Sequence, residues 1–119
     1  MALLMQDFGT FNRLHIWVEL EDDSLQVNDQ TRMLLFVKNE HKKFIVSKIE
    51  IRLSINPKGP AIMPNPINIE KLVPGRTVRE VLPLNVGNSE IDKYELRMSV
   101  DFQLVPETWE LDPLPFRVQ

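Results

Sequence analysis

The chain has 119 residues, 43% hydrophobic and 26% charged, which is typical of one globular domain and not of a disordered segment. Its net charge of −3, from 17 acidic and 14 basic residues, argues against nucleic-acid and anionic-membrane partners, because both favour a basic surface. The chain has no cysteine, so disulfides, thiolate-bound metals and a catalytic thiol are excluded.

The N-terminal residues carry no regular hydrophobic pattern. We expect residues 1–13 to be a mobile extension or an edge segment of a single domain that spans residues 14–119. Residues 1–7 have a short apolar run without the basic start of a secretory signal, and no window reaches the ~18 apolar residues of a membrane span. These features predict a cytoplasmic protein with no membrane contact.

From residue 14 onward apolar and polar residues alternate, which is typical of half-buried β-strands. The first such run covers residues 14–20. In the second, residues 33–37, Leu34 and Phe36 make the other face apolar as well, so we expect a central strand there. A third run covers residues 48–55, and residues 67–69 form a short one.

The C-terminal half continues the pattern. In residues 76–86, Val81 and Pro83 break the alternation, which indicates a bulge or an edge strand, because proline cannot donate to a ladder. Residues 94–104 alternate without exception and predict the longest strand, with its buried face running from Tyr94 to Leu104. A run at residues 114–118 completes a set of about seven strands.

Turn residues such as Pro74-Gly75 and Gly87-Asn88-Ser89 separate these runs. About seven short strands in a chain of this length predict an all-β fold, an immunoglobulin-like two-sheet antiparallel β-sandwich. A small β-barrel is the competing closure of the same strands.

The loop at residues 56–66 is stiffened by several prolines and carries the apolar residues Ala61, Ile62 and Met63. One interpretation is a preorganised contact surface for a protein partner. The other is that Ile62 and Met63 fold back and close one end of the sandwich, as loop residues often do.

The two tryptophans are the other candidates for recognition. Trp17 shares the non-core face of its strand with His15, and its large apolar ring would suit a protein partner or a sugar. The alternative is that the N-terminal segment or a second subunit covers this face. We expect Trp109 to pack over the end of the sandwich.

No residue pattern points to catalysis. The two histidines, His15 and His41, lie on different predicted elements, and the four glycines are scattered, so zinc-ligand spacing, a G-x-S-x-G elbow and a phosphate loop are all absent. The acidic residues 19–23 lack the loop spacing and the glycine of a calcium site. We therefore predict no enzymatic activity, no cofactor and no metal site.

Four segments follow one another in an order that is known from a group of β-sandwich domains. They are Val37-Lys38-Asn39, Leu72-Val73-Pro74-Gly75, the strand from residue 94 and Phe116-Arg117-Val118. This order resembles the immunoglobulin-like accessory domains that include the CARDB-type adhesion modules, with a looser similarity to adaptin-ear and arrestin-like sandwiches, over residues 14–118. The resemblance implies a binding or spacing role and brings no catalytic or ligand residues. The chain departs from the group after Asn39, where a glycine usually follows soon and Glu40 stands here.

Together these features predict a non-enzymatic protein-interaction module that acts through the residue 56–66 loop or a sheet edge. A homodimer is a subsidiary prediction, because the edges of small sandwiches must be paired or protected. A carbohydrate-binding or adhesion module that uses Trp17, and a structural spacer domain from a longer chain, are the alternatives.

Overall fold

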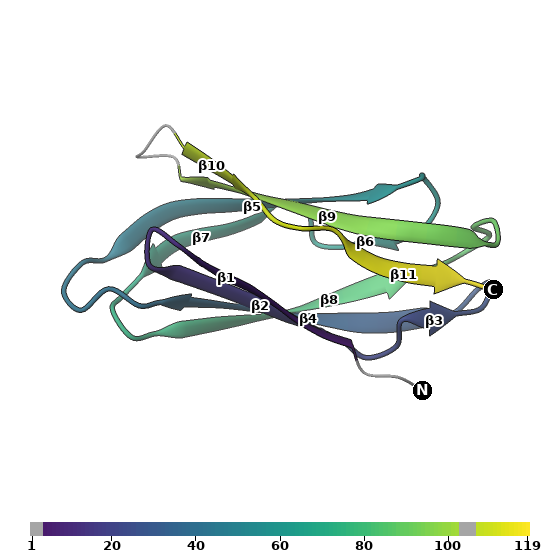
Figure 1. Cartoon of the computed structure of the whole chain (residues 1–119), viewed down its shortest axis with the longest axis horizontal. Helices are drawn as coiled ribbons and strands as arrows, with labels where there is room; N and C mark the ends of the chain where they lie inside the picture. The colour runs from purple at the N-terminus through teal and green to yellow at the C-terminus, as the bar shows by residue number, and fades with distance from the viewer. Residues whose placement is uncertain (1–3, 103–106) are drawn as a thin grey trace.

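The computed structural model describes residues 4–102 and 107–119 of the chain. Eleven strands form two β-sheets that pack face to face, and these residues contain no helix (Figure 1). The part of the chain that is described therefore lacks any helix of the length and apolarity that crossing a bilayer requires. The predicted β-sandwich is confirmed, and it has more strands than the seven or so that were predicted. The molecule measures 46 × 26 × 20 Å.

The first sheet, sheet A, has five antiparallel strands in the order β1-β2-β4-β8-β6. Its strands are β1 (Leu4–Phe11), β2 (Leu14–Leu20), β4 (Gln30–Asn39), β8 (Thr77–Asn85) and β6 (Ala61–Ile62). The central place of β4 confirms the prediction made from its two apolar faces. Because β6 pairs only with the last two residues of β8, the rest of β8 is a sheet edge.

The second sheet, sheet B, has the order β3-β11-β9-β5-β7, and β10 pairs with β9 beyond the end of β11. Its strands are β3 (Ser24–Leu25), β11 (Leu114–Val118), β9 (Asp92–Phe102), β5 (Val46–Asn56), β7 (Ile67–Leu72) and β10 (Glu107–Glu110). Its pairs are antiparallel except for β3 with β11.

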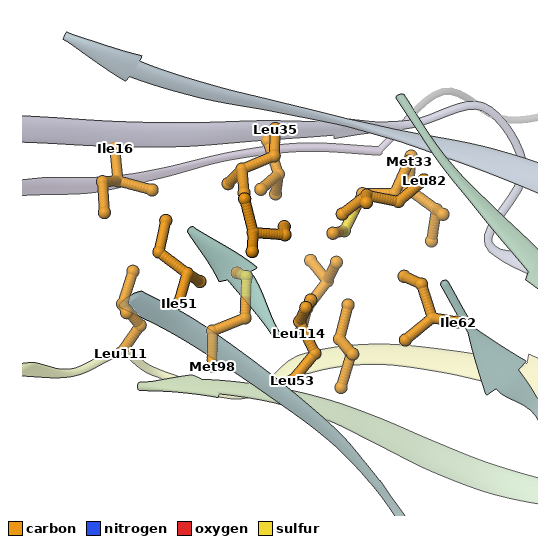
Figure 2. Close-up of a cluster of buried hydrophobic side chains, with 14 of the residues drawn as sticks. Ile16, Met33, Leu35, Ile51, Leu53, Ile62, Leu82, Met98, Leu111 and Leu114 are labelled. Atoms are coloured by element: carbon orange, nitrogen blue, oxygen red, sulfur yellow. The ribbon is translucent and has the colours of Figure 1, made fainter. Parts of the chain in front are cut away.

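The residues predicted to face inward form the core between the sheets. Those of β2 are at most 1% exposed, and the alternating residues of β9 from Tyr94 to Phe102 are at most 7% exposed. Figure 2 shows side chains of sheet A, such as Leu35, meeting side chains of sheet B, such as Ile51 and Met98. Leu104, predicted to end the buried row of β9, lies outside the described residues.

The strands that the pattern did not predict are short or interrupted. β3 and β6 have two residues each and β10 has four, too few for a period of two to be recognised. In β1 the register with β2 shifts between Asp7 and Gly9, and this bulge interrupts the alternation.

The N-terminal segment adds an edge strand, which was one of its two predicted roles. Asn12 and Arg13 alone connect β1 to β2, with φ angles of 49° and 60°. Two left-handed residues in a two-residue loop match the twist of a hairpin, so β1 lies beside β2 in the plane of sheet A.

The irregular pattern around Pro83 indicated either a bulge or an edge strand, and the structure shows an edge strand. The register of β8 with β4 runs without a shift from Thr77 to Asn85, so no bulge is present in this pair. On β8 the half-buried Glu80 pairs with the buried Leu35 and so faces the core side of the sheet. An inward-pointing charge on an edge strand discourages pairing with other chains.

Candidate interaction surface

Trp17 lies in the middle of the outer face of sheet A, the face turned away from the core. Across the strands it is flanked by Asp7 on β1 and by Phe36 on β4, and Arg79 on β8 comes next. The rings of Trp17 and Phe36 stack with their centroids 5.2 Å apart and their planes 4° apart. Both side chains are half-buried, since each covers part of the other.

The next row of the same face extends this apolar area. Met5, Glu19, Leu34 and Val81 follow one another across β1, β2, β4 and β8. Met5 is 60% exposed and Val81 40% exposed. We call the apolar residues of these two rows the outer patch, and they are Met5, Trp17, Leu34, Phe36 and Val81. An antiparallel sheet usually turns a polar face to water, so this composition is unusual.

The N-terminal segment does not cover Trp17. We considered that the N-terminal segment would lie over this face, but β1 continues the sheet beside β2. The hairpin at Asn12 and Arg13 is too short to let β1 fold across the sheet. The outer patch is therefore part of the surface of this chain, and whether a second subunit covers it stays a prediction.

His15 borders the outer patch and is held by two carboxylates. Its Nε2 lies 2.8 Å from Oδ1 of Asp7, and its Nδ1 lies 2.9 Å from Oε1 of Glu40. Asp7 also accepts a hydrogen bond from the backbone N–H of Gly9, and these contacts lower the pKa of Asp7, that of Gly9 most and that of His15 next. The contact of His15 with Asp7 joins β2 to β1, and because the His15 ring packs against Trp17 at 4.8 Å, this contact lies beside the tryptophan.

The proline-rich loop places its three apolar residues differently. Ile62 is 5% exposed and lies in the core, as Figure 2 shows, whereas Ala61 and Met63 are exposed. The prediction of Ile62 as a partner-contact residue is therefore corrected, because the pairing of β6 with β8 turns Ile62 inward beside Leu84. The alternative that Ile62 closes the core is confirmed, and Met63, at 59% exposed, does not join it.

The same loop is anchored at its far end to sheet B. The side-chain amide of Asn65 accepts a hydrogen bond from the N–H of Leu53 at 2.9 Å and donates one to its carbonyl at 2.7 Å. Asn65 thereby takes the place of a strand partner at the part of β5 that β7 does not reach. Ala61 and Met63 remain candidate contact residues at the far side of sheet A from Trp17, with β4 and β8 between them.

A feature that the sequence did not predict lies at the end of the sandwich formed by the β1–β2, β4–β5 and β7–β8 connections. There Asn39 is fully buried, and its side-chain N–H groups donate to the carbonyls of Phe44 and Leu72, both at 2.9 Å. Its Oδ1 accepts the N–H of His41 at 2.9 Å, and its carbonyl accepts the N–H of Gly75 at 2.8 Å. One buried amide thus ties two of these loops together.

An open pocket of about 580 Å³ lies at this same end. Ile45, Val46 and Phe102 form its apolar walls, and Arg13 and Glu107 contribute charged groups. Its described lining comes from residues 12–13, from residues 41–47 and from the ends of β9 and β10 at Phe102 and Glu107, so no single stretch of sequence could have indicated it. Two of the segments that carry the family resemblance, Val37-Lys38-Asn39 and Pro74-Gly75, meet here through the hydrogen bond between Gly75 and Asn39.

The remaining predicted residues take structural places. Trp109 on β10 stacks on Phe11 of β1 at 5.6 Å, and Phe11 packs on Phe102 of β9 at 5.8 Å. This cluster joins the two sheets, as expected for a tryptophan that packs at the end of the sandwich. In residues 4–102 and 107–119, no three His, Cys, Asp or Glu side chains gather in a way that could hold a metal ion.

Comparisons with known proteins give information on the fold alone. No family model matches the chain, and no curated protein matches its sequence. The structure is similar to the crystal structure of a FixG-related protein from Vibrio parahaemolyticus, with a TM-score of 0.59 and 13% sequence identity. The likeness covers 92% of this chain and 99% of that chain. At this identity it supports a shared β-sandwich fold alone.

Proposed function

We propose that this chain is a non-enzymatic protein-interaction module and that its contact surface is the outer face of sheet A. The observation that carries the proposal is the stacked pair of Trp17 and Phe36 in the middle of a sheet face where polar residues are usual. The charged residues Asp7, Glu19 and Arg79 lie among and beside the apolar ones. Aromatic anchors bordered by polar residues are typical of protein–protein contact surfaces.

The rigidity of the surface supports the same role. The residues of the outer patch stand on four hydrogen-bonded strands, so little backbone freedom remains to be lost when a partner binds. His15, bound between Asp7 and Glu40, also limits the movement of Trp17. A preformed apolar face of this kind gains affinity from the release of water without paying for loop ordering.

A protein partner fits Trp17 better than a sugar does. Sugar binding by tryptophan uses an open ring face, and here Phe36 lies parallel to the ring at 5.2 Å. The His15 ring packs at 4.8 Å as well, so the indole presents less than a full face to solvent. We also propose that the chain belongs to the immunoglobulin-like accessory class and is located in the cytoplasm. Membership of this class would agree with a binding role.

Affinity capture from the source cell tests the proposal with the full chain as bait. We expect partners recovered by the wild type to be lost with the Trp17→Thr/Phe36→Thr variant and weakened with Val81→Lys, because both changes remove apolar contact area. The replacement by threonine keeps a β-branched residue on each strand, and circular dichroism checks the fold.

Arg97→Thr is the matched control, since Arg97 is exposed on the outer face of sheet B. Recovery of the same partners by wild type and outer-patch variants would overturn the proposal. A glycan panel read by tryptophan fluorescence tests the alternative, and a response that disappears in Trp17→Thr would favour a carbohydrate module.

A further inference from the structure

One end of the sandwich is both basic and apolar. In its loops Phe44 is 70% exposed, Ile45 is 47% exposed and Val73 is 38% exposed. The exposed basic residues beside them are Arg13, Lys42, Lys43 and Arg76. None of the salt bridges found among residues 4–102 and 107–119 includes these four. We call this the basic end, at the left of Figure 1.

The acidic residues near the basic end are already engaged. Glu40 binds His15, and Glu107 accepts a hydrogen bond from the side chain of Asn12 at 2.7 Å. The loops themselves are held by Asn39, which bonds to Phe44 and Leu72. The exposed apolar and basic side chains therefore stand on a fixed support.

The opposite end of the molecule carries the opposite charge. There the turn at residues 26–29 meets the connection from β8 to β9, since the N–H of Asn28 donates to Gly87 at 2.8 Å and the N–H of Val86 donates to Asp29 at 2.9 Å. These segments expose Val27 by 41% and Ile91 by 71%. Three exposed acidic residues of this end, Asp29, Glu90 and Asp92, are matched by three exposed basic ones, Lys58, Lys93 and Arg117. Its excess of negative charge comes from the half-buried Asp22 and Asp23 between β2 and β3, where the carbonyl of Asp23 accepts the N–H of Arg117 at 3.0 Å. We call it the acidic end.

The two ends lie at opposite tips of the 46 Å long axis, along which the strands run (Figure 1). One copy of the chain could therefore place its basic end against the acidic end of another with both long axes in line. The cross-section of 26 × 20 Å limits such a contact to at most about 500 Å² per copy, or about 1,000 Å² in total, which is the lower limit of specific interfaces.

We propose that copies of this chain associate head to tail, basic end to acidic end. The charges attract, and each end contributes apolar side chains that water would otherwise solvate. Ile91, an apolar residue 71% exposed, is the side chain that we assign to the open pocket of about 580 Å³ between Ile45 and Phe102. Because two different surfaces meet, the contact can add further copies in a row.

This inference does not depend on the outer face of sheet A, so either proposal can fail alone. Sedimentation equilibrium of the full chain tests it first. We expect the average mass to rise above the 13.9 kDa of one copy between about 10 µM and 1 mM, a range that suits an interface near the lower size limit. Raising the salt concentration should reverse this rise, because exposed charges are screened.

Charge reversal then distinguishes the two ends. We expect Lys42→Glu/Lys43→Glu to remain a single copy, since both of its ends are now acidic, and Glu90→Lys/Asp92→Lys to do the same, since its acidic end is now basic. An equimolar mixture of the two variants should associate again, because each reversed end meets a complementary one. Arg52→Glu/Arg97→Glu changes the charge equally on sheet B and should associate like the wild type.

Several results would overturn the inference. One is a wild type that stays at 13.9 kDa up to about 1 mM. Another is association that persists in both reversed variants, which would place the contact elsewhere, such as the outer face of sheet A. A third is a wild type that remains a single copy but binds phosphatidylserine vesicles through Lys42 and Lys43, which would make the basic end a membrane contact.

Discussion

At the scale of single residues, Asn39 matters more than its position at the end of a strand suggests. It is fully buried and uses both donors and both of its acceptor groups to hold the β4–β5 loop and the β7–β8 turn. A buried polar group is tolerated when all of its hydrogen bonds are made, and a broken set leaves its partners without bonds.

Replacing Asn39 with alanine should lower the free energy of unfolding by about 2–4 kcal/mol, because the carbonyls of Phe44 and Leu72 would lose their donors. Urea unfolding followed by tryptophan fluorescence measures the change. Asn68→Ala, at an exposed position on β7, is the control and should stay within about 0.5 kcal/mol of the wild type. A small effect at Asn39 would mean that water replaces the amide at this end.

Ile62 and Met63 are neighbours with opposite roles, so they make a matched pair. Ile62→Asp should lower the free energy of unfolding by about 4 kcal/mol or more, since it buries a charge in the core. Met63→Asp, at a side chain that is 59% exposed, should change it by about 0.5 kcal/mol or less. Chemical denaturation compares the two, and equal effects would contradict the inward orientation of Ile62.

At the scale of elements, the sheet edges differ in how they are protected. β8 turns Glu80 inward along its open stretch, and β7 ends sheet B with Glu70 and Lys71 exposed. β1 is the longest edge, and its bulge at Gly9 interrupts the row of groups that another strand would pair with. These features argue against edge-to-edge pairing and favour contacts through a face or an end.

The contacts of Asp7 on β1 predict that the stability of the chain depends on pH. The pKa of Asp7 is lowered in the folded chain, mainly by the N–H of Gly9 and then by His15, from an ordinary value of 3.8. A lowered pKa contributes stability above the unfolded value, and that stability is lost as the pH falls through the folded value. The advantage of wild type over Asp7→Asn should therefore shrink as the pH drops below about 4.

The difference in urea midpoint between wild type and Asp7→Asn, measured from about pH 7 to about pH 2, tests this dependence. The effect should be small, because the Asp7 side chain is 62% exposed and water screens its contacts. Asp112→Asn, at an exposed position outside β1, serves as the control. A midpoint difference that is the same at every pH would mean that the contacts of Asp7 do not stabilise β1.

At the scale of the whole molecule, the net charge of −3 hides a separation of charge. Acidic residues outnumber basic ones at the end formed by the β2–β3 connection, residues 26–29 and the β8–β9 connection, and basic residues outnumber acidic ones at the end around Asn39. The net charge of the chain therefore does not describe either end. The contacts proposed for this chain therefore use separate surfaces, the outer patch and the two ends.

The sequence by itself determined the positions of the longer strands other than β1, and which of their residues face the core. Alternation is a local property, so the runs at β2, β5 and β9 could be recognised without knowing their partners. It also placed β4 at the centre of a sheet, because Leu34 and Phe36 made both of its faces apolar. Trp17 was correctly assigned to the outer face for the same local reason.

Only the tertiary structure decided what these strands bring together. The stacking of Trp17 on Phe36 depends on the register of β2 with β4, and the inward turn of Ile62 depends on its pairing with β8. The pocket and the basic end join loops that lie far apart in the chain, and Asn39 shows its role only when Phe44 and Leu72 are beside it. Such contacts follow from long-range strand pairing, which no local pattern in the sequence specifies.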